Sequence, residues 1–246
     1  MASSVAYNMD CMDALRKMPD NAFDLAVVDP PYGIGVTAAH IVGNHTQLVG
    51  GGGRAFGGNN ESTVKKRTYI STFYRPFDDS SPPDAEYFRE LFRVSRHCVI
   101  WGGNFFLDML GKATCIIVWD KHRRGMDQAD CEIAWTNLPG QSRIFEYTWN
   151  GMLQGNMKNK EERFHPTQKP VALYAWIFSH YAKPGDKILD THLGSGSSRI
   201  AAYDAGLDFV GYEIDKEYFE KQEERFAAHS AQVSFFDSLE GGDPDA

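Results

Sequence analysis

The sequence predicts an α/β fold in which a mostly parallel sheet is covered by helices on both faces. Short apolar segments typical of buried strands alternate with amphipathic segments typical of helices. One strand segment, residues 187–190, runs into a glycine-rich turn and a helix start, an arrangement with which such folds bind ligands. The length of 246 residues suits one α/β domain with modest insertions.

The first half of the chain contains one strongly predicted strand, residues 24–29, which is apolar, rich in β-branched residues and stopped by Pro30 and Pro31. A short helix is expected before it, at 13–18. Glycine runs predict an irregular segment at 33–70, and loops of that length are usually functional or disordered. The other elements predicted here are a helix at 83–95 and strands at 98–101, 114–119 and 131–135.

The second half begins with residues 136–164, which are polar and are predicted to be irregular. An amphipathic helix follows at 171–181 and is ended by Pro184 and Gly185. The last residues, 241–246, are expected to be disordered. The elements predicted between these segments are a strand at 187–190, a helix at 197–205, a strand at 209–212 and a helix at 216–229.

The composition is that of an ordinary globular protein, with 42% hydrophobic and 24% charged residues. No apolar run approaches the roughly 20 residues that cross a bilayer, and we expect no signal peptide. The four cysteines lack the spacing of zinc ligands, so we expect free thiols in a reducing cytoplasm and no metal. A net charge of −8 argues against non-specific coating of nucleic acid, but not against a DNA enzyme with locally positive surfaces.

The segment from Ile188 to Ser198 joins a strand to a helix through the turn Leu-Gly-Ser-Gly. Small residues there let a ligand approach backbone N–H groups closely. Glu213 ends the next strand at a spacing from Asp190 that suits a carboxylate bound to a ribose diol. A dinucleotide site is the competing interpretation, but Arg199 stands where its third glycine belongs. Taken alone, the segment would also fit an ordinary structural turn.

Asp29-Pro30-Pro31-Tyr32 follows the first strong strand and suits chemistry on an exocyclic amino group of a base. That nitrogen is a poor nucleophile because its lone pair is delocalised into the ring. A carboxylate and a backbone carbonyl that accept its hydrogens draw it toward sp³ geometry. Proline fixes φ and adds no competing N–H donor, while Tyr32 offers a flat face to a flipped base. Taken alone, these residues would also fit a strand that ends in a proline turn.

Several blocks, in order, resemble the DNA adenine-N6/cytosine-N4 methyltransferases, in the subgroup whose catalytic motif precedes the glycine motif. The resemblance covers nearly the whole chain except 36–70 and about 136–164. It implies a Rossmann-like class I S-adenosylmethionine-dependent methyltransferase fold and a site-specific DNA methyltransferase. Adenine N6 is the favoured target, since cytosine-N4 enzymes more often carry serine at the position of Asp29. The blocks are 8–15, 29–32, 165–170, 190–198 and 213–215.

The resemblance implies one domain over 1–246, with a loop insert at about 36–70 and a target-recognition region at about 136–164. The family usually has Asp-Pro-Phe where this chain has Asp190-Thr-His, so His192 either replaces an aromatic partner of the cofactor or fills its space. The implied catalytic residues are Asp29, Pro30, Pro31 and Tyr32. The residues implied to bind S-adenosylmethionine are Asp10, Cys11, Asp29, Thr167, Lys169, Asp190, His192, Gly194, Ser195, Gly196, Ser197, Glu213 and Ile214.

Basic residues gather in the glycine-rich insert, at 121–124 and at 158–165. Phosphate contacts of such clusters position a protein on DNA, although a solvated loop is the alternative for each cluster. The expected partner is double-stranded DNA, in a bacterial or phage-infected cell, and the family is also consistent with a homodimer and a partner restriction nuclease. The residues predicted to bind DNA are Arg54, Lys65, Lys66, Arg67, Lys121, Arg123 and Arg124.

Three alternatives remain open at this point. A transferase of the same fold would act on cytosine N4 or on an amide of a protein. A catalytically silent DNA-binding protein has no evident need for both Asp29–Tyr32 and the glycine turn. A nicotinamide oxidoreductase would leave Asp29–Tyr32 unexplained.

Overall fold

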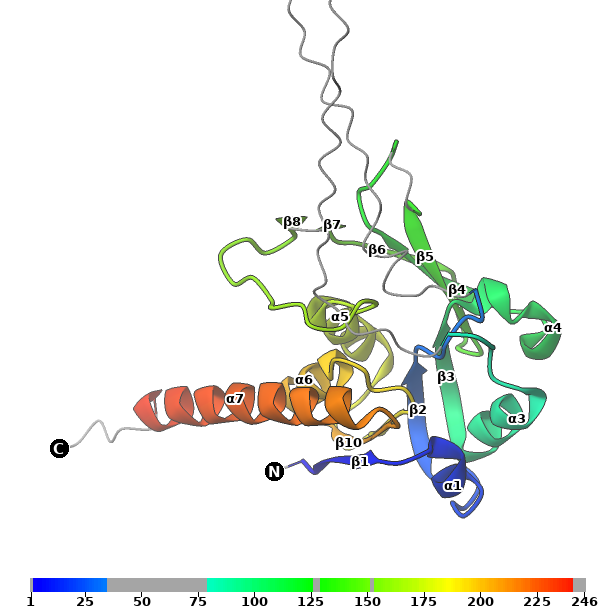
Figure 1. Ribbon diagram of the computed structural model, residues 1–246, viewed down its shortest axis with the longest axis horizontal. Coiled ribbons are helices and arrows are strands. Elements are labelled where there is room, and N and C mark those ends of the chain that lie inside the picture. The colour runs from blue at the N-terminus through cyan, green and yellow to red at the C-terminus, as the bar shows by residue number, and fades with distance from the viewer. Residues whose placement is uncertain (1, 35–78, 126–128, 151–152, 241–246) are drawn as a thin grey trace, which may run out of the picture.

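The computed structural model of the protein describes residues 2–34, 79–125, 129–150 and 153–240, arranged around an eight-stranded sheet (Figure 1). The strands of this sheet are β1 (Ser4–Asn8), β2 (Phe23–Val28), β3 (Ser95–Trp101), β4 (Cys115–Asp120), β5 (Cys131–Thr136), β6 (Arg143–Glu146), β9 (Lys187–Asp190) and β10 (Asp208–Glu213). β7 (Trp149–Asn150) and β8 (Leu153–Gln154) pair separately. The helices are α1 (Cys11–Leu15), α3 (Ala85–Val94), α4 (Leu107–Leu110), α5 (Val171–Tyr181), α6 (Ser197–Asp204) and α7 (Lys216–Glu240), with a 3₁₀ turn η1 at Gly103–Phe105.

The strand order of the main sheet is β1-β10-β9-β2-β3-β5-β4-β6. The first five strands in this order are parallel, and β5 runs antiparallel to its neighbours β3 and β4. The chain proceeds from β2 to β3 on one side and from β9 to β10 on the other, so the order reverses between β2 and β9. Such a switch point leaves a crevice at the carboxyl ends of the two strands, where ligands bind in open α/β sheets.

Both faces of the sheet are covered by helices, as Figure 1 shows. Along β2, Leu25 and Val27 belong to a core cluster with side chains of α5 and α6. Ala26 and Val28 point to the opposite face and join a second cluster with α1 and α3. Because both faces are buried, the strand reads as a continuous apolar run rather than an alternating one. The predicted fold class, a mostly parallel sheet between two helical layers, is confirmed.

Two observed elements, α5 and β9, have the bounds that the sequence predicts. The prediction that 136–164 is irregular is wrong in part, because β6 pairs with β4 and β7 pairs with β8 within it. β1 was not predicted, and α7 continues past the predicted end at residue 229. The insert predicted at 36–70 and the tail at 241–246 lie outside the described residues. Among the helices that the structure describes, none combines the length and the apolar character needed to cross a membrane.

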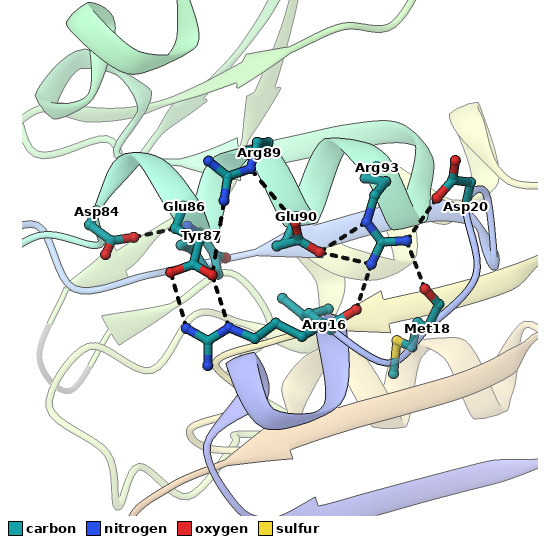
Figure 2. A network of polar contacts seen from close by, with 10 residues as sticks. Arg16, Met18, Asp20, Asp84, Glu86, Tyr87, Arg89, Glu90 and Arg93 are labelled. Carbon is teal, nitrogen blue, oxygen red and sulfur yellow. Dashed lines mark hydrogen bonds and ion pairs between the residues drawn. The ribbon is translucent and has the colours of Figure 1, made fainter.

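A polar network joins α3 to α1 and to the turn that follows α1 (Figure 2). The Arg93 guanidinium donates to the carbonyls of Leu15 and Met18 at 2.8 and 2.7 Å. These carbonyls lie at or just beyond the end of α1, where backbone acceptors lack intrahelical partners. Arg16 adds a two-pronged contact to Glu86 at 2.9 and 3.1 Å. The network therefore holds α1 in place, and α1 begins at the motif that the sequence predicts to contact a cofactor.

We expect Arg93→Ala to lower the melting temperature by several degrees more than Arg89→Ala. Both substitutions remove one arginine from α3, but the Arg93 side chain is 28% exposed and binds two carbonyls, whereas that of Arg89 is 67% exposed. Exposed ion pairs contribute little to stability. Thermal unfolding followed by circular dichroism measures the difference, and equal melting temperatures would contradict this role of Arg93.

Candidate active site

The carboxyl ends of four adjacent parallel strands carry the predicted motifs side by side. β1 ends at Asn8, which lies in register with Glu213 at the end of β10 and donates through Nδ2 to its carbonyl at 2.8 Å. β9 ends at Asp190 beside β10, and β2 runs into Asp29 on the other side of β9. Asp10 follows β1 as the N-cap of α1. Four segments far apart in the sequence therefore meet at the switch point.

The turn after β9 has a conformation that favours glycine. Gly194 and Gly196 have φ values of +52° and +74°, in the left-handed region. The Gly194 N–H donates to the Glu213 carboxylate at 2.8 Å, which ties the turn to the end of β10. Gly196 is the N-cap residue of α6, so the helix starts immediately after the turn.

Two carboxyl groups lie in this part of the site, Asp190 buried and Glu213 half-buried. Burial raises the pKa of Asp190 to about 7, against hydrogen bonds from the Ser198 hydroxyl and the His192 N–H at 2.5 and 3.0 Å. Burial also raises the pKa of Glu213, against backbone N–H groups that donate to it. Because desolvation is the main cause of both shifts, a cationic ligand placed here would stabilise the ionised carboxylates.

Asp29 is held by two side chains. Its Oδ1 accepts from the Tyr32 hydroxyl at 2.7 Å, and its Oδ2 accepts from Lys169 Nζ at 2.5 Å. The Lys169 side chain is only 3% exposed, and its ammonium also lies 3.1 Å from Glu132. Burial raises the pKa of Asp29, and Lys169 opposes that shift. Burial alone would lower the pKa of Lys169, but its two carboxylate partners raise it, so the ammonium stays charged.

Glu132 and Lys121 extend this ion-pair network. Glu132 lies at the start of β5, and because β5 is antiparallel its start lies at the same edge as the carboxyl ends of its neighbours. Burial acts to raise the pKa of Glu132, but Lys169 and Lys121 lower it to about 2. Sequence reasoning missed Glu132, although a carboxylate inside an otherwise apolar strand pattern was a usable signal. Lys121 is buried and paired with Glu132, which corrects its predicted place in an exposed basic cluster.

The ring of Tyr32 is set by two neighbours that were not predicted. Phe105 stacks on it with ring centroids 5.0 Å apart and planes 18° apart, and Phe105 is itself 44% exposed. Gly102 has φ +68°, and a Cβ there would lie 2.2 Å from Cε1 of Tyr32. The sequence predicted a role only for the ring face of Tyr32, but in the structure its hydroxyl also donates a hydrogen bond to Asp29. Of the two prolines, Pro30 is buried and Pro31 is half-buried.

The other predicted cofactor residues border the same edge. His192 contacts the ring of Tyr87 edge-on at 5.4 Å, which makes it an aromatic packing residue where the family usually has phenylalanine. His165 packs against Tyr218 and pairs with Thr167 Oγ1 at 3.1 Å. The remaining predicted residues divide into buried Cys11, Ser195 and Ser197 and highly exposed Ile214.

The predicted DNA-binding residues are only partly described. The four in the insert, namely Arg54, Lys65, Lys66 and Arg67, lie outside the described residues. Arg123 is half-buried and donates to the carbonyl of Trp149 in β7 at 2.5 Å. Arg124 has a side chain that is 70% exposed and pairs with Asp120 at 2.5 Å. Of the cluster at 121–124, Arg124 is therefore the cation that faces solvent most openly.

All four cysteines are free thiols and lie in the described part of the chain. One group there has the composition of a cation site: ligand atoms of Asp120, His122 and Glu146 lie within 4.8 Å of one another. His122 and Glu146 are exposed, and Arg124 already neutralises Asp120. This group is separate from the network around Asp29.

Parts of the chain are similar in sequence to known DNA methyltransferases. Residues 114–224 match the N6_N4_Mtase family, described as DNA methylase. The chain is 35% identical over 82 residues to the type II methyltransferase M.HpaI of Haemophilus parainfluenzae. It is 37% identical over 79 residues to the type II methyltransferase M2.DpnII of Streptococcus pneumoniae. These matches cover 33% and 31% of this chain, but only 25% and 30% of those proteins.

Two solved structures share the fold over nearly the whole chain. The structure of M1.HpyAVI in complex with SAM is 18% identical, covers 92% of this chain and 98% of that chain, and has a TM-score of 0.52. The cytosine-N4-specific PvuII DNA methyltransferase is 13% identical, covers 92% of this chain and 87% of that chain, and has a TM-score of 0.54. At these identities the likeness concerns the fold alone.

We expect Gly102→Ala to destabilise the protein more than Gly206→Ala. The two glycines have φ values of +68° and +66°, so a Cβ adds similar backbone strain of about 1–2 kcal/mol at each. The Cβ at Gly206 would meet open space, whereas that at Gly102 would meet the Tyr32 ring. Overpacking should cost about 1–3 kcal/mol more.

Urea denaturation gives the two free energies of unfolding for this comparison. A loss for Gly102→Ala no larger than that for Gly206→Ala would show that Tyr32 is not packed against Gly102.

Proposed function

We propose that this chain, whose residues 114–224 match the DNA methylase family of N6 and N4 methyltransferases, is a member of that family and a site-specific DNA methyltransferase. It transfers a methyl group from S-adenosylmethionine to the exocyclic amino group of a flipped base. One observation carries the proposal: Asp29 and the Gly194–Gly196 turn lie at the carboxyl ends of the adjacent strands β2 and β9. A donor bound at the turn and an amino group bound at Asp29 would be neighbours.

The acidic edge fits S-adenosylmethionine better than a dinucleotide. Glu213, Asp190 and Asp10 present carboxylates there, and burial has raised the pKa of the first two. S-adenosylmethionine brings two cationic groups, a sulfonium and an ammonium, and hydroxyls that donate to carboxylates. A nicotinamide dinucleotide would bring a negatively charged diphosphate against the same groups. The structural neighbour M1.HpyAVI was solved with SAM, which supports this choice.

Asp29 would act on the nucleophile. When bound, S-adenosylmethionine would supply an electrophilic methyl group for the amino nitrogen, with its sulfur as the leaving atom that keeps the electron pair. The Asp29 carboxylate accepts a hydrogen of the amino group, so that the nitrogen lone pair leaves the ring system. It also stabilises the positive charge that grows on the nitrogen, and it takes the proton released afterwards and passes it to water. Tyr32, whose ring packs against Phe105, would stack on the flipped base.

Adenine N6 is the proposed target. The fold does not choose between the two bases, because a cytosine-N4 enzyme shares it. The first residue of the catalytic motif supports adenine, since cytosine-N4 enzymes more often have serine where this chain has Asp29. Double-stranded DNA is the proposed substrate, with residues 136–164 as the proposed target-recognition region. Of the basic residues at 121–124, Arg124 has a side chain that is 70% exposed, and it is the one we propose to contact the DNA backbone.

Calorimetry should detect binding of S-adenosylmethionine and not of NAD. Glu213→Gln removes one negative charge but keeps an acceptor for the Gly194 N–H, so the turn is retained. Hydrogen bonds to a charged group contribute about 1.5–3 kcal/mol, so affinity for the cofactor should fall about tenfold or more. Glu220→Gln, on the exposed side of α7, is the control. Tight binding of NAD without binding of S-adenosylmethionine would refute the cofactor assignment.

Asp29→Ala should abolish methyl transfer while leaving the fold intact. Lys169 keeps Glu132 as a carboxylate partner, so its buried ammonium is not left unpaired. Losing a charge-assisted acceptor of the transition state costs on the order of 3–4 kcal/mol, or about 10²–10³ in rate. Labelled S-adenosylmethionine and DNA from a methylation-deficient strain provide the assay, with Asp108→Ala at an exposed position of α4 as control.

Nucleoside mass spectrometry of the product DNA identifies the base. N6-methyladenine is expected, and N4-methylcytosine instead would overturn the target while keeping the reaction. If Asp29→Ala retains more than about a tenth of wild-type turnover, a loss under about 1.4 kcal/mol, Asp29 is not the catalytic carboxylate.

A further inference from the structure

Four charged side chains, two buried and two half-buried, alternate in sign beside the carboxyl ends of the strands. Asp29 pairs with Lys169, Lys169 with Glu132, and Glu132 with Lys121. The side chains of the four residues are between 3% and 25% exposed. Two carboxylates and two ammonium groups balance, which is how charges become tolerable away from water. Lys169 is the shared member, since it contacts both carboxylates, at 2.5 and 3.1 Å.

In the proposed reaction, Asp29 must also accept a hydrogen bond from the substrate amino group. Oδ1 of Asp29 accepts from Tyr32 and Oδ2 accepts from Lys169. Each oxygen keeps a second lone pair, but both donors draw on the negative charge of Asp29, so a substrate amino group binds Asp29 more strongly when one of them moves away. Lys169 is the donor with an alternative, because its ammonium already lies beside Glu132. A buried ammonium without a carboxylate partner is strongly disfavoured, so Lys169 can leave Asp29 only if such a partner remains.

We propose that Glu132 is a positioning residue for methyl transfer: it holds the Lys169 ammonium when the substrate amino group takes over Oδ2 of Asp29. This inference rests on the proposed function. Lys121 keeps Glu132 in place from the other side, through Oε1, and leaves Oε2 to Lys169. The ring of Trp101 also lies beside the ammonium, with its centroid 5.6 Å from Lys169 Nζ.

Removing the charge of Glu132 takes a carboxylate partner from Lys121 and has two consequences for Asp29. In Glu132→Gln, Asp29 is the one carboxylate left within ion-pair distance of Lys169 among the described residues. Lys169 then binds Asp29 more firmly and competes with the substrate amino group. The negative charge of Glu132 also raises the pKa of Asp29, while Lys169 lowers it. Without Glu132 the Asp29 pKa therefore falls, and the acid limb of the pH–rate profile moves to lower pH. The other titratable groups that face the network, which the substitution retains, are Tyr32, Lys121, Arg123, His165, Tyr174 and Asp190.

The test is steady-state methylation of DNA from a methylation-deficient strain, with tritiated S-adenosylmethionine, across a range of pH. For Glu132→Gln we expect kcat to fall at least about tenfold, equivalent to about 1.4 kcal/mol, and the acid limb to move to lower pH. Affinity for S-adenosylmethionine, measured by calorimetry, should change less than about threefold. Glu220→Gln removes an exposed carboxylate from α7 and should leave both rate and profile unchanged.

Glu132→Asp is the second variant, and it keeps the proposal testable if the glutamine variant fails to fold. Aspartate keeps the charge but is one methylene shorter, so the acid limb should stay near its wild-type position while kcat falls. A Glu132→Gln enzyme with wild-type kcat and an unmoved acid limb would overturn the inference. So would a Glu132→Asp enzyme whose acid limb moves as far as expected for Glu132→Gln. A wild-type protein that methylates no DNA would instead refute the proposed function, so the two failures are distinguishable.

Discussion

A lysine ammonium that is almost completely buried must keep carboxylate partners, and that requirement ties three parts of this chain together. Lys169 belongs to the segment before α5, Asp29 follows β2, and Glu132 begins β5. If any of the three segments moved away, a charge would be left unpaired in a region where pairing is costly to lose. The ion-pair network thus fixes Asp29 and Tyr32 against the sheet, beside the motifs that the sequence predicts to bind a cofactor.

The sheet supplies the other half of the arrangement. Its order reverses between β2 and β9, and Asp29 and the Gly194–Gly196 turn follow these two adjacent strands at the same edge. Ligands bind at such a point in open α/β sheets. The hydrogen bond from Gly194 to Glu213 brings in the end of β10, and Asn8 joins β1 to the same edge. Acidic residues at the ends of β9 and β10 therefore lie beside Asp29, which is paired with Lys169. A cationic methyl donor and an amino nucleophile are complementary to those two places.

Several site features follow from contacts between distant residues rather than from local pattern. Tyr32 was assigned a stacking face from its type, but its orientation depends on Phe105 and on the absence of a Cβ at Gly102. In the sequence Lys121 resembles the arginines near it, yet its place at the end of β4 brings it against Glu132. The solvent exposure of a charged side chain depends on the residues packed around it. The four residues 121–124 alone therefore do not show which of their side chains is buried.

The sequence by itself determined the fold class, the bounds of α5 and β9, and the motifs around Asp29 and Asp190, because each depends on a local pattern of apolar residues, glycine or proline. Only the tertiary structure decided that β1 and β6 are strands, since both are half-exposed or exposed segments whose hydrogen bonds come from β10 and β4. It also decided the place of Glu132, which lies far from Asp29 in the sequence. Lys169 joins them in space because paired charges can be buried whereas a single charge cannot.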